Sequence, residues 1–152
     1  MSWDERWLEL ATLVSTWSKD RSRKVGAVIV DDRNVLLAIG WNGFPRGVND
    51  NVDKRYERPI KYKYTEHSER NAIYNAASRG IPLLGSTMYL PWFPCADCAR
   101  AIIQSGIKKL ICVEPNWNDP NYANDFKVTL IMLQEAEIDY KFNNKFLAPI
   151  QK

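Results

Sequence analysis

Cysteine and histidine are scarce in this chain of 152 residues, which has three cysteines and a single histidine. An odd number of cysteines argues against a disulfide framework. The same scarcity limits how many metal sites the chain can build. No apolar run approaches the roughly 20 residues that span a bilayer, and the first residues show no basic region followed by an apolar stretch. We therefore expect a cytoplasmic protein with no membrane partner.

A strong charge of either sign is also absent. Lys and Arg number 21 and Asp and Glu number 18, which gives a net charge of +3. This balance is too weak to indicate a nucleic-acid partner, but it fits a phosphate-bearing small molecule. A local basic stretch fits a solvated loop and a phosphate contact equally well. It contains Lys54, Arg55, Arg58, Lys61 and Lys63.

The length fits a single domain over 1–152, since domains commonly have about 100–200 residues. Apolar residues recur at helical spacing from Trp3 to Trp17, and Ser2 with Glu5 forms a capping box. Two strands joined by a tight turn are expected next. These strands cover 25–31 and 35–41; helices are expected over 66–79, 96–105 and 125–136, and further strands over 86–90, 109–113 and 138–142.

The order of elements is therefore α-β-β-α-β-α-β-α-β. The first two strands form a hairpin, whereas single helices between the later strands imply parallel crossovers. We predict an α/β domain in three α-β-α layers, with a mixed five-stranded sheet. Residues 42–65 remain as a long loop rich in Gly, Pro, Asn and charge. A loop of this length inside a compact domain is usually functional.

Two short segments at predicted helix starts carry the candidate chemistry. They are His67-Ser68-Glu69 and Pro94-Cys95-Ala96-Asp97-Cys98. A catalytic zinc takes three protein ligands and leaves its fourth position to water, and His67, Cys95 and Cys98 supply such a set. A helix N-terminus favours the thiolate form of cysteine. Glu69 follows the histidine closely enough to carry protons without binding the metal.

The pattern H-x-E with P-C-x-x-C is the signature of zinc-dependent nucleobase deaminases. A Cys-x-x-Cys pair also occurs in redox proteins and in structural zinc sites. A redox pair does not need His67 and Glu69, and a closed structural site needs a fourth ligand. Cys112 is the one spare cysteine, and it lies in an apolar run where it behaves as a small hydrophobe. We therefore predict one catalytic Zn²⁺ per chain.

With these motifs the chain resembles the cytidine deaminase superfamily, and within it the deoxycytidylate (dCMP) deaminases, over about residues 17–138. The segments that carry this resemblance are Ser18-Lys19-Asp20, Lys24-Val25-Gly26-Ala27, Gly40-Trp41-Asn42-Gly43-Phe44-Pro45-Arg46-Gly47, Lys61-Tyr62-Lys63-Tyr64, Cys98-Ala99-Arg100 and Gln104-Ser105-Gly106-Ile107. Three positions depart from the family pattern. Ser68 replaces the usual Ala, Arg70 replaces an apolar residue, and Trp41 replaces Tyr.

The resemblance implies hydrolysis of dCMP to dUMP and ammonia, in which a zinc-bound hydroxide attacks C4 of cytosine and Glu69 carries the proton. It implies that Asn42 hydrogen-bonds the sugar, although a turn residue is the alternative. Tyr64 or Trp117 is expected to stack on the base, with ordinary packing as the alternative. Ser68 is also expected to contact the substrate.

The resemblance further implies a homo-oligomer, namely a hexamer, regulated by dCTP and dTTP. The Gly-rich segment 40–47 is the expected effector site because its backbone can approach phosphates closely. The residues expected there are Gly40, Trp41 and Gly43. Basic side chains on both sides of the active site are expected to bind the substrate phosphate. These are Arg23, Lys24 and Arg46.

Two kinds of alternative remain open. One is a deaminase of the same fold that acts on another base, such as cytidine, deoxycytidine, guanine, a modified dCMP or a tRNA adenosine. The other is a catalytically inactive, zinc-containing nucleotide-binding protein. The presence of Glu69 beside the ligand His67 argues against the inactive protein.

Overall fold

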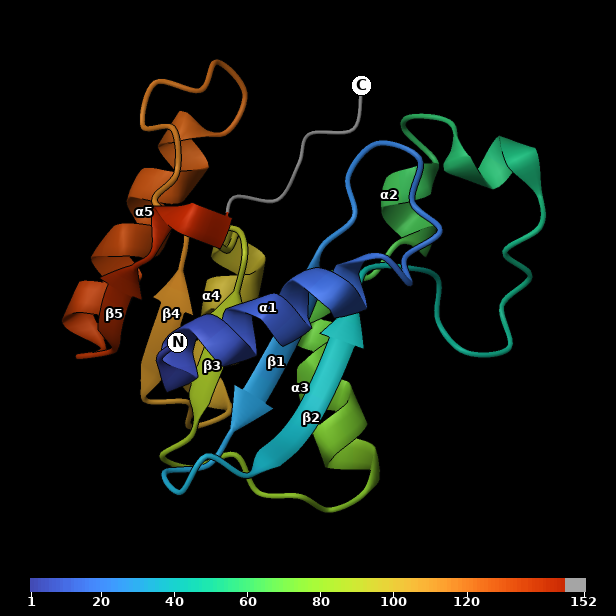
Figure 1. Ribbon diagram of the computed structural model, residues 1–152. Helices are drawn as coiled ribbons and strands as arrows, with labels where there is room; N and C mark the ends of the chain where they lie inside the picture. The colour runs from blue at the N-terminus through green and yellow to red at the C-terminus, as the bar shows by residue number, and fades with distance from the viewer. Residues whose placement is uncertain (147–152) are drawn as a thin grey trace.

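The computed structural model describes residues 1–146. Its centre is a sheet with the strand order β2-β1-β3-β4-β5, which Figure 1 shows beneath the first helix. The strands are β1 (Gly26–Val30), β2 (Leu36–Trp41), β3 (Thr87–Leu90), β4 (Lys109–Cys112) and β5 (Asp139–Phe142). β1 pairs antiparallel with β2 and β3, whereas β3, β4 and β5 run parallel. The predicted mixed sheet, opening hairpin and parallel crossovers are confirmed.

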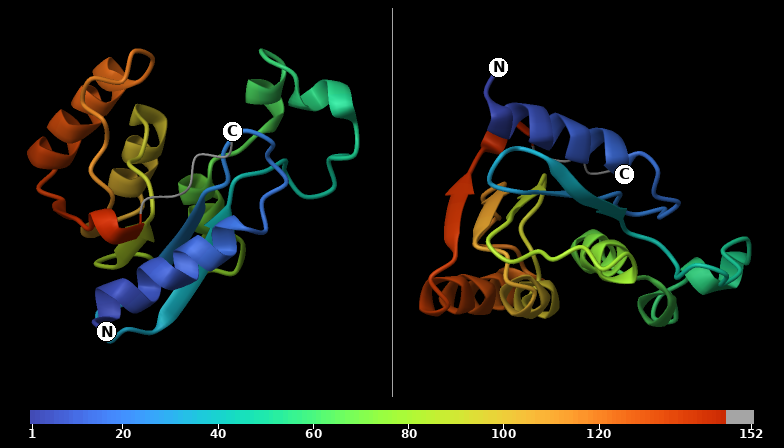
Figure 2. Two further views of the ribbon diagram at one scale, coloured as in Figure 1. Left: turned by 45° about the horizontal axis from the view of Figure 1, so that its top comes forward. Right: turned by 90° about the horizontal axis from the view of Figure 1, so that it is seen from below.

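Helices cover both faces of the sheet, and Figure 2 shows the resulting three layers. The helix α1 (Trp3–Ser15) lies on one face; the helices α3 (Ser68–Ser78), α4 (Ala96–Gln104) and α5 (Ala123–Glu135) lie on the other. Successive side chains of a strand point to opposite faces. Val28 of β1 therefore packs beneath α1, while its neighbour Ile29 packs beneath the other helices. The sheet separates two apolar cores.

The first helix begins as predicted. Ser2 Oγ accepts a hydrogen bond from the Glu5 N–H at 3.2 Å, and the Glu5 carboxylate accepts one from the Ser2 N–H at 2.8 Å. The capping box is thus confirmed. The helix ends at Ser15, so Trp17 lies beyond it. The Trp17 ring packs edge-on against Trp41, with the centroids 5.3 Å apart.

The segment 42–65 differs from the expected loop, because it contains two helical turns. They are η1 (Asp53–Tyr56) and α2 (Lys61–Tyr64). Phe44 stacks on the last tyrosine of each turn, with ring centroids 4.8 and 5.3 Å away. The turns are stabilised by this tertiary contact rather than by a periodic apolar face, which is why the sequence pattern did not reveal them.

The remaining elements are confirmed, with boundaries shifted by one or two residues. The helix α3 begins at Ser68 because Glu66, where it was expected to start, is paired as a strand with Gly43. The helix α5 begins at Ala123 rather than at 125. Within residues 1–146, no helix is long and apolar enough to cross a membrane.

Candidate active site

The two chemical motifs meet at the starts of α3 and α4. His67 is the N-cap of α3 and Cys95 is the N-cap of α4. His67 Nδ1 lies 3.5 Å from Cys95 Sγ and 3.4 Å from Cys98 Sγ, and the three ligand atoms lie within 4.8 Å of one another. Zn–N and Zn–S bonds of about 2.0 and 2.3 Å at a tetrahedral angle place nitrogen and sulfur about 3.5 Å apart. These side chains therefore fit one zinc ion, as predicted.

The pKa values of the two cysteine thiols are shifted in opposite directions. The hydrogen bond from Cys98 lowers the pKa of Cys95 to about 5, with His67 contributing in the same direction. The same contact, together with burial, raises the pKa of Cys98. The hydrogen bond with Cys95 also raises the pKa of His67. Since the thiolate is the metal ligand, metal binding must expel the Cys98 proton.

Glu69 lies beside these ligands and is almost fully buried, with 4% of its surface exposed. Its Oε1 accepts a hydrogen bond of 2.6 Å from the hydroxyl of Ser68, which is itself completely buried. Both residues face the cavity that contains the ligands, a space of about 690 Å³. A pocket of this size accommodates a nucleotide-sized ligand.

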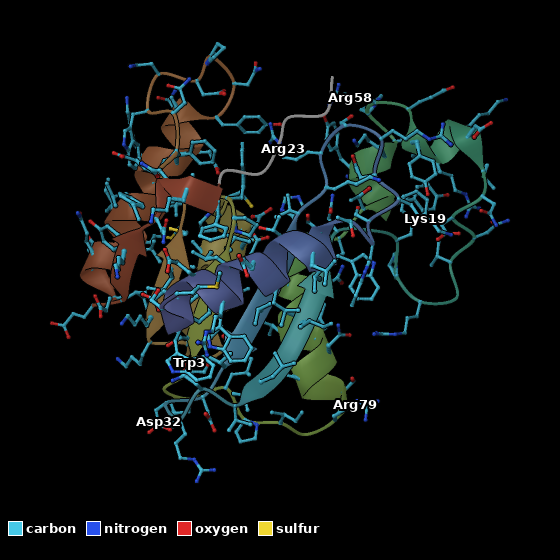
Figure 3. The ribbon with its side chains drawn as sticks, viewed as in Figure 1. Trp3, Lys19, Arg23, Asp32, Arg58 and Arg79 are labelled. Carbon is cyan, nitrogen blue, oxygen red and sulfur yellow. The ribbon has the colours of Figure 1, made fainter. Side chains whose placement is uncertain are left out.

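Basic side chains converge on this cavity from several segments. They are Arg21, Arg23, Arg58, Lys61 and Arg70. Lys61 is buried and pairs with Asp20 at 3.4 Å, and Arg21 pairs with Asp53 at 2.6 Å. Within residues 1–146, Arg23 and Arg58 pair with no carboxylate. Figure 3 shows these two arginines at the same end of the molecule.

Of the three residues predicted to bind the substrate phosphate, one lines this cavity and two do not. Arg23 lines the cavity, with its guanidinium 3.9 Å from the ring centroid of Trp92. Lys24 and Arg46 do not line it, and Arg46 instead donates a hydrogen bond of 2.6 Å to Asn75 on α3. Arg58 was missed as an individual residue, although the basic stretch that contains it was recognised. Its place at the cavity depends on how the segment 42–65 folds.

The residue predicted to contact the sugar lines the cavity, whereas the two residues predicted to stack on the base do not. Asn42 lines the cavity, but its Oδ1 accepts from the Val25 N–H at 2.9 Å and its Nδ2 donates to the Arg23 carbonyl at 2.8 Å. Tyr64 and Trp117 lie outside the cavity, where each packs against a phenylalanine. The aromatic residues that do line it are Tyr62, Trp92, Tyr122 and Phe126.

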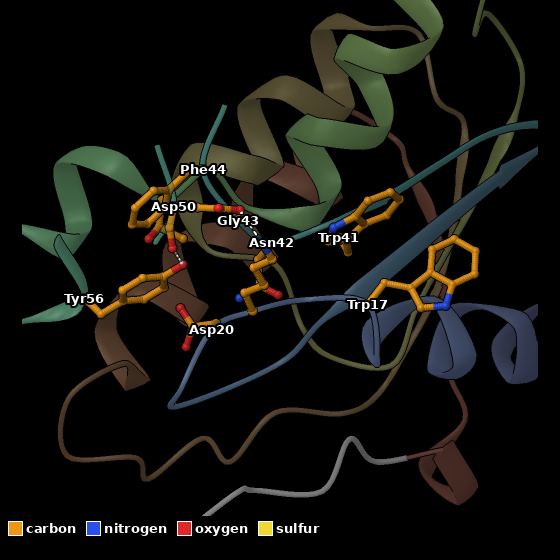
Figure 4. A pocket seen from close by; sticks show the side chains of 10 residues that line it. Trp17, Asp20, Trp41, Asn42, Gly43, Phe44, Asp50 and Tyr56 are labelled. Atoms are coloured by element: carbon orange, nitrogen blue, oxygen red, sulfur yellow. Dashed lines mark hydrogen bonds and ion pairs between the residues drawn. The ribbon is translucent and has the colours of Figure 1, made fainter. Parts of the chain in front are cut away.

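A second cavity of about 280 Å³ lies next to the first. Figure 4 shows Trp41 and Gly43 on its wall, together with Trp17, Asp20, Asn42, Phe44, Asp50 and Tyr56. Gly40 is not part of it. A Cβ atom on Gly40 would lie 2.3 Å from the Ala72 nitrogen, so this glycine allows β2 to pack closely against α3.

The fold and the site together define the class of the protein. A three-layer α/β domain with His, Cys and Cys ligands and a buried glutamate at two helix starts is a zinc-dependent deaminase. Residues 1–114 match the family described as the cytidine and deoxycytidylate deaminase zinc-binding region. The chain belongs to this family.

Relatives and solved structures agree with this assignment. The human deoxycytidylate deaminase is 38% identical over 128 residues, covering 81% of this chain and 71% of the relative. A deaminase of Aliivibrio fischeri encoded near luxG is 46% identical over 112 residues, covering 74% of this chain and 73% of the relative. The crystal structure of the dCMP deaminase from cyanophage S-TIM5 with dCMP and dUMP is 27% identical and superposes with a TM-score of 0.73, covering 91% of this chain and 95% of that one.

Proposed function

We propose that this protein hydrolyses dCMP to dUMP and ammonia. The observation that carries the proposal is the buried Glu69 beside the ligand set, in a cavity lined by Arg23 and Arg58, neither of which pairs with a carboxylate within residues 1–146. When held by His67, Cys95 and Cys98, a zinc ion would supply a water molecule activated near neutral pH. Glu69 would take a proton from water placed at C4 and deliver it to N3 of the ring, while the water oxygen bonds to C4. Glu69 would then carry the second water proton to the C4 amino group, so that the C4–N bond breaks and ammonia leaves.

Arg23 and Arg58 are the residues that we assign to the substrate phosphate. They line the cavity from separate segments, and Arg58 is oriented by a hydrogen bond of 2.7 Å from its Nε to the Tyr62 hydroxyl. An arginine that binds phosphate donates paired, charge-assisted hydrogen bonds. Trp92 and Tyr122 provide the nearby aromatic surface for the base. We assign the phosphate to these two arginines rather than to Lys24 and Arg46, because neither Lys24 nor Arg46 lines the cavity.

A comparison of kcat/KM for dCMP and deoxycytidine tests the substrate. Charge-assisted hydrogen bonds contribute about 1.5–3 kcal/mol each, so two of them favour dCMP by about 10²–10⁴-fold. Arg58→Gln should lower kcat/KM for dCMP by about tenfold or more and leave that for deoxycytidine unchanged. Arg46→Gln, outside the cavity, is the matched control. Equal values for the two substrates would assign the protein to the nucleoside deaminases.

We also propose that dCTP and dTTP act at the second cavity. Asp20, Asn42 and Thr65 line both cavities, so a ligand in the smaller one bears directly on the wall of the larger one. The Thr65 hydroxyl is buried there without a hydrogen-bond partner within residues 1–146. The rate at subsaturating dCMP should change with dCTP or dTTP. A rate unaffected by both would argue against regulation but not against catalysis.

We further propose that the protein forms a homo-oligomer, namely a hexamer. Large apolar side chains point outward, including Leu84 at 83% exposure and Ile131 at 52%, and such surfaces commonly mark subunit contacts. Light scattering of the purified protein measures the assembly. We place the protein in the cytoplasm, because a reducing compartment preserves the free thiols of Cys95 and Cys98.

A further inference from the structure

Arg70 bridges the two segments that carry the metal ligands. Its Nε lies 2.5 Å from Glu66 Oε1, and its NH1 lies 3.6 Å from Asp97 Oδ2. Glu66 immediately precedes the histidine ligand, and Asp97 lies between the two cysteine ligands. One guanidinium therefore joins the start of α3 to the start of α4, at the point where the metal site is assembled from them.

Of the two carboxylate partners of Arg70, Glu66 is held in place by the backbone around it. The same Glu66 oxygen accepts a hydrogen bond of 3.0 Å from the backbone N–H of His67. The backbone of Glu66 also exchanges hydrogen bonds of 2.8 and 3.1 Å with Gly43. On the other helix, Asp97 is additionally paired with Arg100. Movement of Arg70 would therefore be transmitted to the backbone beside the histidine ligand and to the first turn of α4.

An ordinary surface ion pair does not account for this arrangement. Exposed pairs four residues apart on a helix contribute little, because solvent screens them. Only 20% of the Arg70 side chain is exposed, its second carboxylate belongs to another helix, and it lines the same cavity as the ligands. By contrast, Arg100 is 61% exposed and pairs within its own helix.

We propose that Arg70 is a positioning residue that holds the histidine half and the cysteine half of the site together and thereby sets how tightly zinc is retained. The positive charge of Arg70 also favours retention of zinc. The two thiolates and Glu69 bring more negative charge than one Zn²⁺ neutralises, and a nearby guanidinium offsets the excess. Residues that orient metal ligands typically change metal affinity by about 10- to 100-fold when they are removed. This inference concerns retention of zinc and does not depend on which nucleotide is deaminated.

The test is the release of zinc from purified holoprotein to a chromophoric chelator. Arg70→Met keeps most of the side-chain volume and removes the charge and both ion pairs. It should speed zinc release by about 10- to 100-fold. Arg70→Lys keeps the charge without the planar fork and should fall between this variant and the unmodified protein. Arg100→Met removes an arginine that shares Asp97 but not Glu66, and it should release zinc at the unmodified rate.

A second readout separates geometry from general destabilisation. In the cobalt-substituted protein, the visible spectrum reports the coordination geometry, and Arg70→Met should alter it while the far-UV circular dichroism stays the same. Unchanged zinc release and an unchanged cobalt spectrum in Arg70→Met would overturn the proposal. If that variant does not fold, Asp97→Asn decides instead. Faster zinc release from Asp97→Asn supports the bridge to α4, and release at the unmodified rate refutes it.

Discussion

The hydroxyl of Ser68 donates a hydrogen bond of 2.6 Å to the carboxylate of Glu69, the residue that follows it. Both side chains are buried, so water does not replace the contact. We expect Ser68→Ala to lower kcat for dCMP by about tenfold, since a hydrogen bond to a charged group contributes about 1.5–3 kcal/mol. KM should stay the same, because the hydroxyl contacts Glu69. Steady-state kinetics check this, and an unchanged kcat would show that the contact is catalytically neutral.

Glu69→Gln should retain the fold and the zinc but lose most of the activity. The amide has the size of the carboxyl group and cannot carry the proton, and such groups contribute typically about 10²–10⁴-fold to the rate. Metal analysis and circular dichroism should match those of the unmodified protein, while kcat falls. A Gln variant with near-normal turnover would contradict the role assigned to Glu69.

Purified protein should contain one zinc per chain. Within residues 1–146, the ligand set His67, Cys95 and Cys98 is the one group of three that can hold a metal ion. Cys112 is completely buried in the apolar core, and burial raises the pKa of its thiol. Elemental analysis against protein concentration measures the ratio. Two tightly bound zinc ions per chain would refute this prediction.

Zinc binding should tighten as the pH rises. The pKa of Cys95 is lowered to about 5, whereas those of Cys98 and His67 are raised. Zinc uptake therefore releases the Cys98 proton and, wherever His67 is protonated, the His67 proton as well. The apparent Kd should fall about tenfold per pH unit for each proton released. Chelator competition at several pH values tests this, and a Kd independent of pH would exclude proton release.

Asn42→Ala should destabilise the protein by about 1–3 kcal/mol, because it leaves the buried N–H of Val25 and the part-buried carbonyl of Arg23 without their partner. Denaturant unfolding measures this change. Since Arg23 lines the active site, KM for dCMP should rise as well. An unchanged unfolding free energy combined with a large loss of kcat/KM would instead assign Asn42 directly to the sugar.

Most helices and strands of the fold could be predicted from local sequence patterns. The tight turn between β1 and β2 and the capping box of Ser2 and Glu5 were both sufficient to place their elements. The turns η1 and α2 were not predictable in this way. They depend on the stacking of Phe44 against tyrosines that lie far along the chain, and short helical turns carry too few residues for a periodic signal.

The sequence by itself determined the metal ligands and the glutamate that we propose as the proton carrier, because the spacing within each motif fixes side chains on a single helix start. The distance between His67 and Glu69 along the chain, and that between Cys95 and Cys98, already specify the local geometry. Only the tertiary structure decided which basic residues line the cavity beside these ligands. Arg23, Arg58 and Arg70 reach one cavity from separate segments, and sequence spacing does not encode contacts between segments whose relative position is set by packing of the whole domain.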